Sequence, residues 1–149
     1  MNYREYLALN FKFIPISLIL ILVVSRLIPH PPNFTPVVTV AIMSGYFFKD
    51  KFFSISVLLI SMLLSDLFIG FHKNMIFVYL SLVTITLIFQ IYFKKLNHKN
   101  LIIYGFLGSL TFFLISNFGV WLIGDLYQKN LNGIIECYYM ALPFFKNTI

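Results

Sequence analysis

Four polar side chains lie inside long apolar segments of the sequence: Arg26, Asp66, Asn117 and Glu136. Ionisable groups inside a membrane are costly and rare, and they usually pair with one another or line a path or site for a solute. A guanidinium can hold an anionic part of a ligand, whereas a carboxylate accepts hydrogen bonds or holds a cationic part. We therefore predict that these residues bind a small solute and that the Asn117 amide orients it.

Aromatic and loop residues extend this predicted site. Trp121 lies one helical turn after Asn117, on the same face, and Tyr139 lies one turn after Glu136. Their rings are suited to stacking on a planar ligand. The proline-rich loop 29–34 follows the first apolar segment, and we expect it to close over the site as a lid. Its members of the predicted set are His30 and Asn33.

A purely structural role is the alternative for these residues. Arg26 can pair with Asp66 or Glu136 and lock helices together, and the Asn117 amide can donate an interhelical hydrogen bond worth about 0.6 kcal/mol. Tyrosine and tryptophan commonly form belts at membrane–water interfaces. The common depth of the polar groups favours a cavity, because Asp66 and Glu136 lie about 7 Å, and Asn117 about 10 Å, from the same end of their segments.

Other chemistry finds no support in the sequence. There is no phosphate-binding G-x-x-x-x-G-K-[ST] motif, no H-E-x-x-H and no G-x-S-x-G. The histidines lack supporting ligands at chelating spacing, so we expect neither a metal nor a cofactor. Cys137 is the single cysteine and cannot form an intramolecular disulfide. We expect a protein that is not an enzyme.

The composition places these residues in a membrane protein. Hydrophobic residues make up 60% of the 149 residues and charged residues only 11%, against about 45–50% and about 25% in soluble domains. The net charge of +6 is explained by loop lysines that set topology, so no nucleic-acid partner is expected. We predict an all-α fold in which residues 1–149 form a single integral membrane domain, a six-helix transmembrane bundle embedded in the lipid bilayer. The expected spans are 11–28, 34–48, 52–71, 75–93, 101–124 and 131–145.

Charge in the loops predicts the orientation of these spans. With the N-terminus in the cytoplasm, eight of the eleven basic residues lie on the inner side and three on the outer side. This bias follows the rule that cytoplasmic loops are enriched in lysine and arginine. We therefore expect both termini in the cytoplasm, a multi-pass protein of the bacterial inner membrane, and the predicted site in the outer half.

Several strings point to a known kind of membrane protein. They are RLIPHPPNFTP at 26–36, LSDLFIGFH at 64–72, NFGVW at 117–121 and CYYMALPFFKNT at 137–148. Together they resemble an uncharacterised bacterial membrane-protein family that is similar to the substrate-binding (S) components of energy-coupling-factor transporters. The resemblance spans nearly the whole chain.

This resemblance implies a six-helix subunit that binds a micronutrient-like solute near the outer face. It also implies partners, a transmembrane coupling subunit and two ATPases, which would supply the energy. The Ala-x-x-x-Ala pattern with which S components often dock is absent from the first segment. The alternative is a non-transporting accessory subunit that stabilises a larger membrane complex.

Overall fold

The computed structural model describes residues 13–29, 36–92 and 98–145, and the regular secondary structure within these ranges is entirely helical. The helices occupy the six apolar segments expected from the sequence. They are α2 (Phe13–Leu27), α3 (Val37–Phe47), α4 (Lys51–Ile69), α5 (Met75–Tyr92), α6 (His98–Ile123) and α7 (Leu131–Phe145). The prediction of an all-α fold is therefore confirmed for the described residues.

Three of these helices are long and apolar enough to cross a membrane: α4, α5 and the part of α6 from Lys99 to Ile123. The other three are shorter. Both α2 and α7 have 15 residues, about 22 Å at 1.5 Å per residue, and α3 has 11 residues, about 16 Å. A hydrocarbon core of about 30 Å exceeds these lengths. The structure thus supports a membrane protein, and a full set of six spans stays a prediction.

The ends of α4 are set by two residues. The Asp50 carboxylate accepts a hydrogen bond from the backbone N–H of Phe53 at 2.7 Å, so it caps the first turn and α4 begins at Lys51. Gly70 has a φ of 102°, which an L side chain rarely adopts, and the helix ends before it. The expected span of about 52–71 thus corresponds to a helix that runs from Lys51 to Ile69 and is followed by a turn at Gly70.

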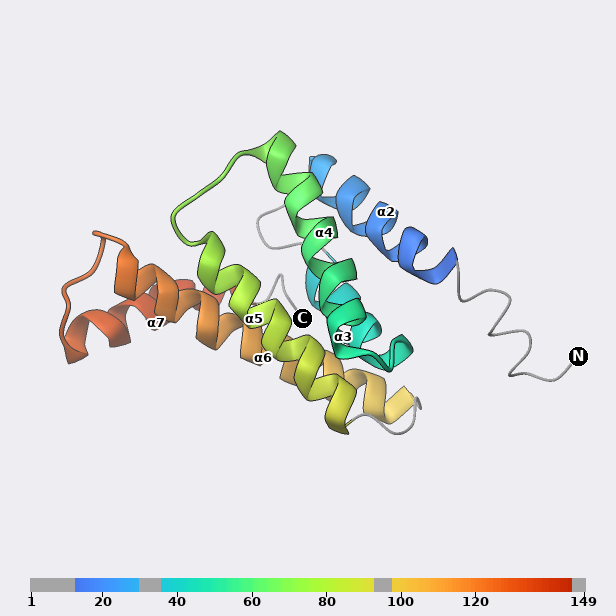
Figure 1. The fold of residues 1–149 in the computed structure, drawn as a ribbon. Helices are drawn as coiled ribbons and strands as arrows, with labels where there is room; N and C mark the ends of the chain where they lie inside the picture. Colours follow the sequence, from blue (N-terminus) through green and yellow to red (C-terminus); the bar gives the residue numbers. More distant parts are fainter. Residues whose placement is uncertain (1–12, 30–35, 93–97, 146–149) are drawn as a thin grey trace, which may run out of the picture.

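Each helix packs against one or more of the others (Figure 1). The most extensive contacts join α3 to α5, α2 to α4, and α5 to α6. Helix α3 is central, because it also contacts α2, α4 and α6. Helix α7 lies at one side of the bundle and packs extensively only against α6. The tightest part of the protein is therefore built by α2 to α5.

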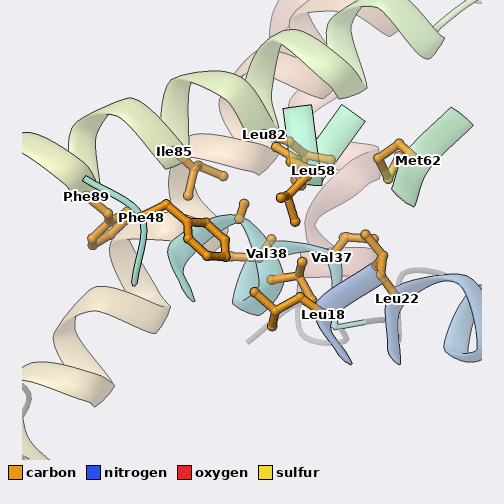
Figure 2. Close-up of a cluster of buried hydrophobic side chains, with 13 residues drawn as sticks. Leu18, Leu22, Val37, Val38, Phe48, Leu58, Met62, Leu82, Ile85 and Phe89 are labelled. Atoms are coloured by element: carbon orange, nitrogen blue, oxygen red, sulfur yellow. The ribbon is translucent and has the colours of Figure 1, made fainter. Parts of the chain in front are cut away.

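The buried core lies between these four helices (Figure 2). Its fully buried side chains include Leu22 from α2, Leu58 from α4 and Ile85 from α5. Phe48 follows α3 directly and is only 1% exposed, so it closes this core at one end. Many large apolar residues elsewhere are exposed, as expected for helices that face lipid.

Helices α3 and α5 approach closely enough for backbone contact. The Thr86 hydroxyl donates to the carbonyl oxygen of Ala41 at 3.1 Å. One turn further, Gly45 leaves no room for a side chain, because a Cβ there would overlap the Thr86 carbonyl oxygen. The Gln90 side-chain amide then donates to the carbonyl oxygens of Phe48 at 2.7 Å and Lys49 at 2.9 Å. Small and polar residues thus fix this helix pair.

We predict that Gly45→Ala destabilises the protein by about 1–3 kcal/mol, the usual cost of overpacking a close contact. The matched control is Gly105→Ala on α6, because a Cβ at Gly105 meets nothing within 4 Å. Thermal unfolding in detergent micelles measures both variants. Equal midpoints for the two variants would contradict the close approach of α3 and α5.

Candidate functional site

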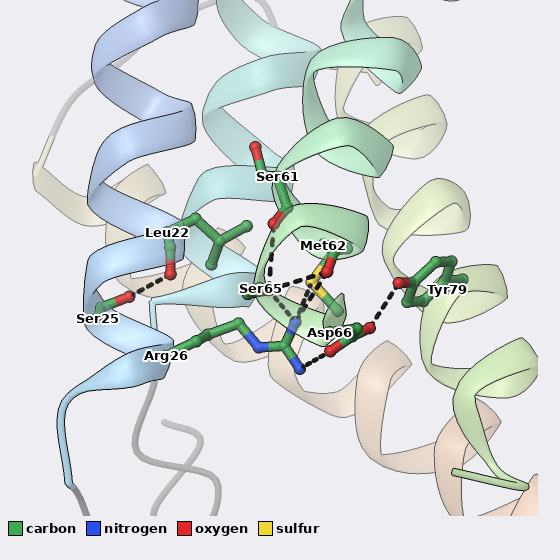
Figure 3. A network of polar contacts seen from close by, with 8 residues as sticks. All are labelled: Leu22, Ser25, Arg26, Ser61, Met62, Ser65, Asp66 and Tyr79. Atoms are coloured by element: carbon green, nitrogen blue, oxygen red, sulfur yellow. Dashed lines mark hydrogen bonds and ion pairs between the residues drawn. The ribbon is translucent and has the colours of Figure 1, made fainter. Parts of the chain in front are cut away.

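An ion pair between α2 and α4 is the centre of the candidate site (Figure 3). Arg26 lies in the last turn of α2, and its Nη2 is 2.5 Å from Oδ1 of Asp66. The Asp66 side chain is only 1% exposed and that of Arg26 is 13% exposed. Both residues were predicted from the sequence as site residues, and the structure brings them together.

Ser65, Tyr79 and the backbone of Met62 contact this ion pair. We call the five residues together the Arg26–Asp66 cluster. The second guanidinium nitrogen of Arg26 donates to the Ser65 hydroxyl and to the Met62 carbonyl oxygen, the latter at 3.3 Å. From α5, the Tyr79 hydroxyl donates to Oδ2 of Asp66 at 2.5 Å. Each carboxylate oxygen of Asp66 therefore faces one donor group, and three helices meet at one charged group.

Tyr79 and Ser65 were missed by sequence reasoning. Ser61 and Ser65 lie one turn apart on α4, which places both on the buried face that also carries Met62. A hydroxyl directly before a buried aspartate was therefore a usable signal for Ser65. Tyr79 carried no such signal, because its partner depends on how α5 packs against α4.

The remaining sequence-predicted residues on α6 belong to a second group of contacts. The Asn117 side chain donates to the Phe113 carbonyl oxygen of its own helix at 2.8 Å, and its backbone oxygen lies 3.5 Å from the Cys137 sulfur of α7. The Tyr138 hydroxyl donates to the Leu114 carbonyl oxygen at 2.6 Å. These contacts hold α7 against α6.

Trp121 lies in the last turn of α6, next to the connection to α7. Its indole N–H donates to the Gln128 carbonyl oxygen at 2.9 Å. The ammonium group of Lys129 lies 5.8 Å from the centre of the Trp121 ring and donates to the carbonyl oxygens of Trp121 and Gly124. A lysine at the C-terminal end of a helix is favourable, because it satisfies carbonyls that have no helical partner. Trp121 therefore takes part in closing the turn.

Two predicted residues on α7 lie on its exposed surface. Glu136 is exposed, and the Tyr139 side chain is 68% exposed beside Met140 and Pro143. The structure does not bring them to the Arg26–Asp66 cluster. His30 and Asn33 lie outside the described residues. Of the polar groups that we expected to share one cavity, Arg26 and Asp66 contact each other directly in the described part of the chain.

Contacts between helices nevertheless place Arg26, Asp66 and Asn117 at one end of the bundle. The Asn74 amide, just before α5, donates to the Ser116 carbonyl oxygen near the end of α6 at 3.1 Å. The start of α5 also carries Tyr79, which contacts Asp66 near the end of α4. We call this end, with the last turns of α2, α4 and α6, the Asp66 end. The common depth expected for Arg26, Asp66 and Asn117 is consistent with these contacts.

The charges of the Arg26–Asp66 cluster are supported by hydrogen bonds from neighbouring side chains. A buried ion pair is stable only where hydrogen bonds satisfy the remaining polar atoms, and the Arg26–Asp66 cluster supplies them from Ser65 and Tyr79. Within the described residues, no group of three histidine, cysteine, aspartate or glutamate residues is placed to hold a metal ion.

Comparison with protein-family models identifies the family of this chain. A model described as a family of unknown function (DUF6580) matches residues 8–149. The chain belongs to the DUF6580 family. Searches of curated proteins and of solved structures give no match. The DUF6580 match covers all six helices and thus includes every residue of the Arg26–Asp66 cluster.

For this DUF6580 protein we predict strong coupling between the two charged residues. Arg26→Met or Asp66→Leu alone should cost about 3–5 kcal/mol of unfolding free energy, because each leaves an unpaired buried charge. The double variant should recover most of that loss. Thermal unfolding in micelles, analysed as a double-mutant cycle, measures the coupling.

The exposed pair of Lys73 and Asp125 is the matched control. Their charged atoms are 3.7 Å apart, and their side chains are 83% and 91% exposed. An exposed pair contributes about 0–1 kcal/mol, so Lys73→Met and Asp125→Leu should show little coupling. If the changes in unfolding free energy for the Arg26 and Asp66 variants were also additive, the ion pair would not stabilise the contact between α2 and α4.

Proposed function

We propose that this protein is a membrane-embedded solute-binding or transport subunit, similar to the S components of energy-coupling-factor transporters. In this proposal it forms a bundle of six spans in the bacterial inner membrane, with both termini in the cytoplasm. The Asp66 end then faces the outer side. Its ligand is a small, micronutrient-like solute with at least one polar or charged group.

The observation that carries this proposal is the Arg26–Asp66 cluster. Asp66 is almost fully buried, and Arg26 and Tyr79 are its partners from two other helices. Placing charge there costs free energy that an apolar pair of similar volume would avoid. A role in solute binding explains why a charged pair is present despite this cost, since ionisable residues inside membranes commonly mark solute pathways.

The ligand in this proposal engages the cluster by replacing an internal partner. Arg26 holds an anionic part, whereas Asp66 accepts hydrogen bonds or holds a cationic part. Tyr79 and Ser65 keep the two charges oriented when the ligand is absent. Asn117 orients the ligand from α6, and the proline-rich loop with His30 and Asn33 acts as the lid. Trp121, Glu136 and Tyr139 lie apart from the cluster, so in this proposal they contact only the part of the ligand that projects toward α6 and α7.

Energy for transport would come from other chains. The sequence has no phosphate-binding loop, so a coupling subunit and ATPases are the partners that this proposal requires. The length of the described helices leaves short connections, which agrees with a subunit that binds a solute and leaves the energy supply to others.

Ligand binding tests the proposal directly. The purified protein is screened by thermal shift against a panel of vitamins and nucleobases, and any ligand that raises the unfolding midpoint is titrated. We expect Tyr79→Phe and Asn117→Ala to weaken binding about tenfold each, the effect of one lost hydrogen bond to a charged or polar partner. Asp66→Asn, which keeps the side-chain shape, should weaken it further.

Asp125→Asn is the matched control, because Asp125 is a highly exposed aspartate whose carboxylate faces only Lys73 among the described ion pairs. This variant should bind like the parent protein. The site assignment is wrong if ligands bind but the Asp66, Asn117 and Tyr79 variants all retain the parent affinity. If no member of the panel binds, the proposal of a micronutrient-like ligand is wrong.

A second function is favoured by the position of α7. This helix packs extensively only against α6, and it exposes Leu131, Ile135 and Tyr139 together with the charged Glu136. A charge on an exposed face of an apolar helix is stabilised by a partner. A non-transporting accessory subunit that stabilises a larger membrane complex would use such a face.

Affinity purification separates the two functions. Recovery of a coupling subunit with ATPases supports the transport subunit. Stoichiometric recovery of another membrane complex without an ATPase supports the accessory subunit. For the latter we expect Glu136→Gln to release the partner, whereas Asp66→Asn, on α4, leaves it bound.

A further inference from the structure

An apolar groove lies between α3 and α6, away from the Arg26–Asp66 cluster. It has a volume of about 320 Å³, within the range of about 300–1,000 Å³ that is common for ligand pockets. Its walls include Ile42, Met43 and Phe47 from α3 and Leu101 from α6. The lining of the groove is therefore mainly apolar and suited to an apolar group.

Glycine creates part of this groove. Gly105 lines it, and a Cβ at this position would meet nothing within 4 Å. Gly108, one turn further along α6, is different, because a Cβ there would press on Val38 and Ile42 of α3. Gly108 thus allows the two helices to approach, whereas the open space at Gly105 is left over and available to another molecule.

Basic residues follow the groove at one end. Lys49 comes two residues after Phe47, and Lys99 comes two residues before Leu101; both lysines are exposed. A second hollow, which shares Phe47 with the groove, continues to Lys49. The neighbouring Asp50 caps α4 through Phe53, so its carboxylate is already occupied by a backbone N–H.

We propose that this groove binds one acyl chain of an anionic phospholipid, with the lipid phosphate held by Lys49 and Lys99. An acyl chain fits the apolar walls, and basic pockets between membrane helices attract anionic headgroups. The contact of Gln90 with the Lys49 carbonyl oxygen fixes the backbone beside this phosphate position. The lipid site is independent of the proposed solute site, which lies at the Asp66 end.

Native mass spectrometry of the full chain tests the proposal. Delipidated protein is mixed with phosphatidylglycerol or with phosphatidylcholine of the same acyl chains, and bound lipid is counted as the collision energy rises. We expect preferential retention of phosphatidylglycerol. Lys49→Gln and Lys99→Gln should each lower that preference about fivefold, and the pair together should abolish it.

Gly105→Leu tests the groove itself. It fills the open space with a side chain, and leucine is also a better helix former than glycine, so the fold is not weakened by the change. Retention of phosphatidylglycerol should fall about tenfold. The matched control is Ile102→Phe, because Ile102 is 75% exposed on α6 and does not line the groove.

Unchanged lipid retention in Gly105→Leu, with a parent-like unfolding midpoint, overturns the proposal. Equal retention of phosphatidylglycerol and phosphatidylcholine by the parent protein overturns it as well, because the lysines would then play no part. Loss of retention in Ile102→Phe would show binding to the general apolar surface and would overturn the groove assignment.

Discussion

The burial of the Asp66 charge is the constraint that ties three helices together, because the charge must be met by Arg26 from α2 and Tyr79 from α5. In lipid, apolar side chains gain little by leaving one apolar surface for another, so helix contacts rely on close packing and polar bonds. The Arg26–Asp66 cluster gives α2, a 15-residue helix with few buried residues, its strongest tie to α4. Tyr79 extends that tie to α5. One charged group therefore coordinates three helices.

A second constraint acts at the opposite end of the core. Gly45 and Thr86 bring α3 and α5 into backbone contact, and Gln90 fixes the residues that follow α3. The Asp66 end is thus held by an ion pair, and the opposite end, near Lys49, is held by close helix packing. The buried ion pair therefore lies at the first end of the bundle and the apolar groove at the second.

Sequence reasoning located the helices well because long apolar runs bounded by turn residues are a strong local signal. It placed α4 to within about two residues at each end, and it predicted the pairing of Arg26 with Asp66 only as one alternative. It predicted that the Trp121 ring stacks on a ligand, and it gave no sign of the contact between the indole N–H and the Gln128 carbonyl oxygen. Contacts such as Tyr79 with Asp66 depend on how separate helices rotate against each other, and spacing along one segment does not encode this rotation.

The closed turn between α6 and α7 has a consequence for folding. Lys129 covers the last carbonyl oxygens of α6, and Asn130 accepts a hydrogen bond from the Gly133 N–H at the start of α7. The contacts of Tyr138 and Cys137 with α6 span only 24 and 20 residues of chain. Partners so close in sequence meet at little cost in loop entropy. The last two helices can therefore pair as a local hairpin that does not depend on contacts with α2 to α5.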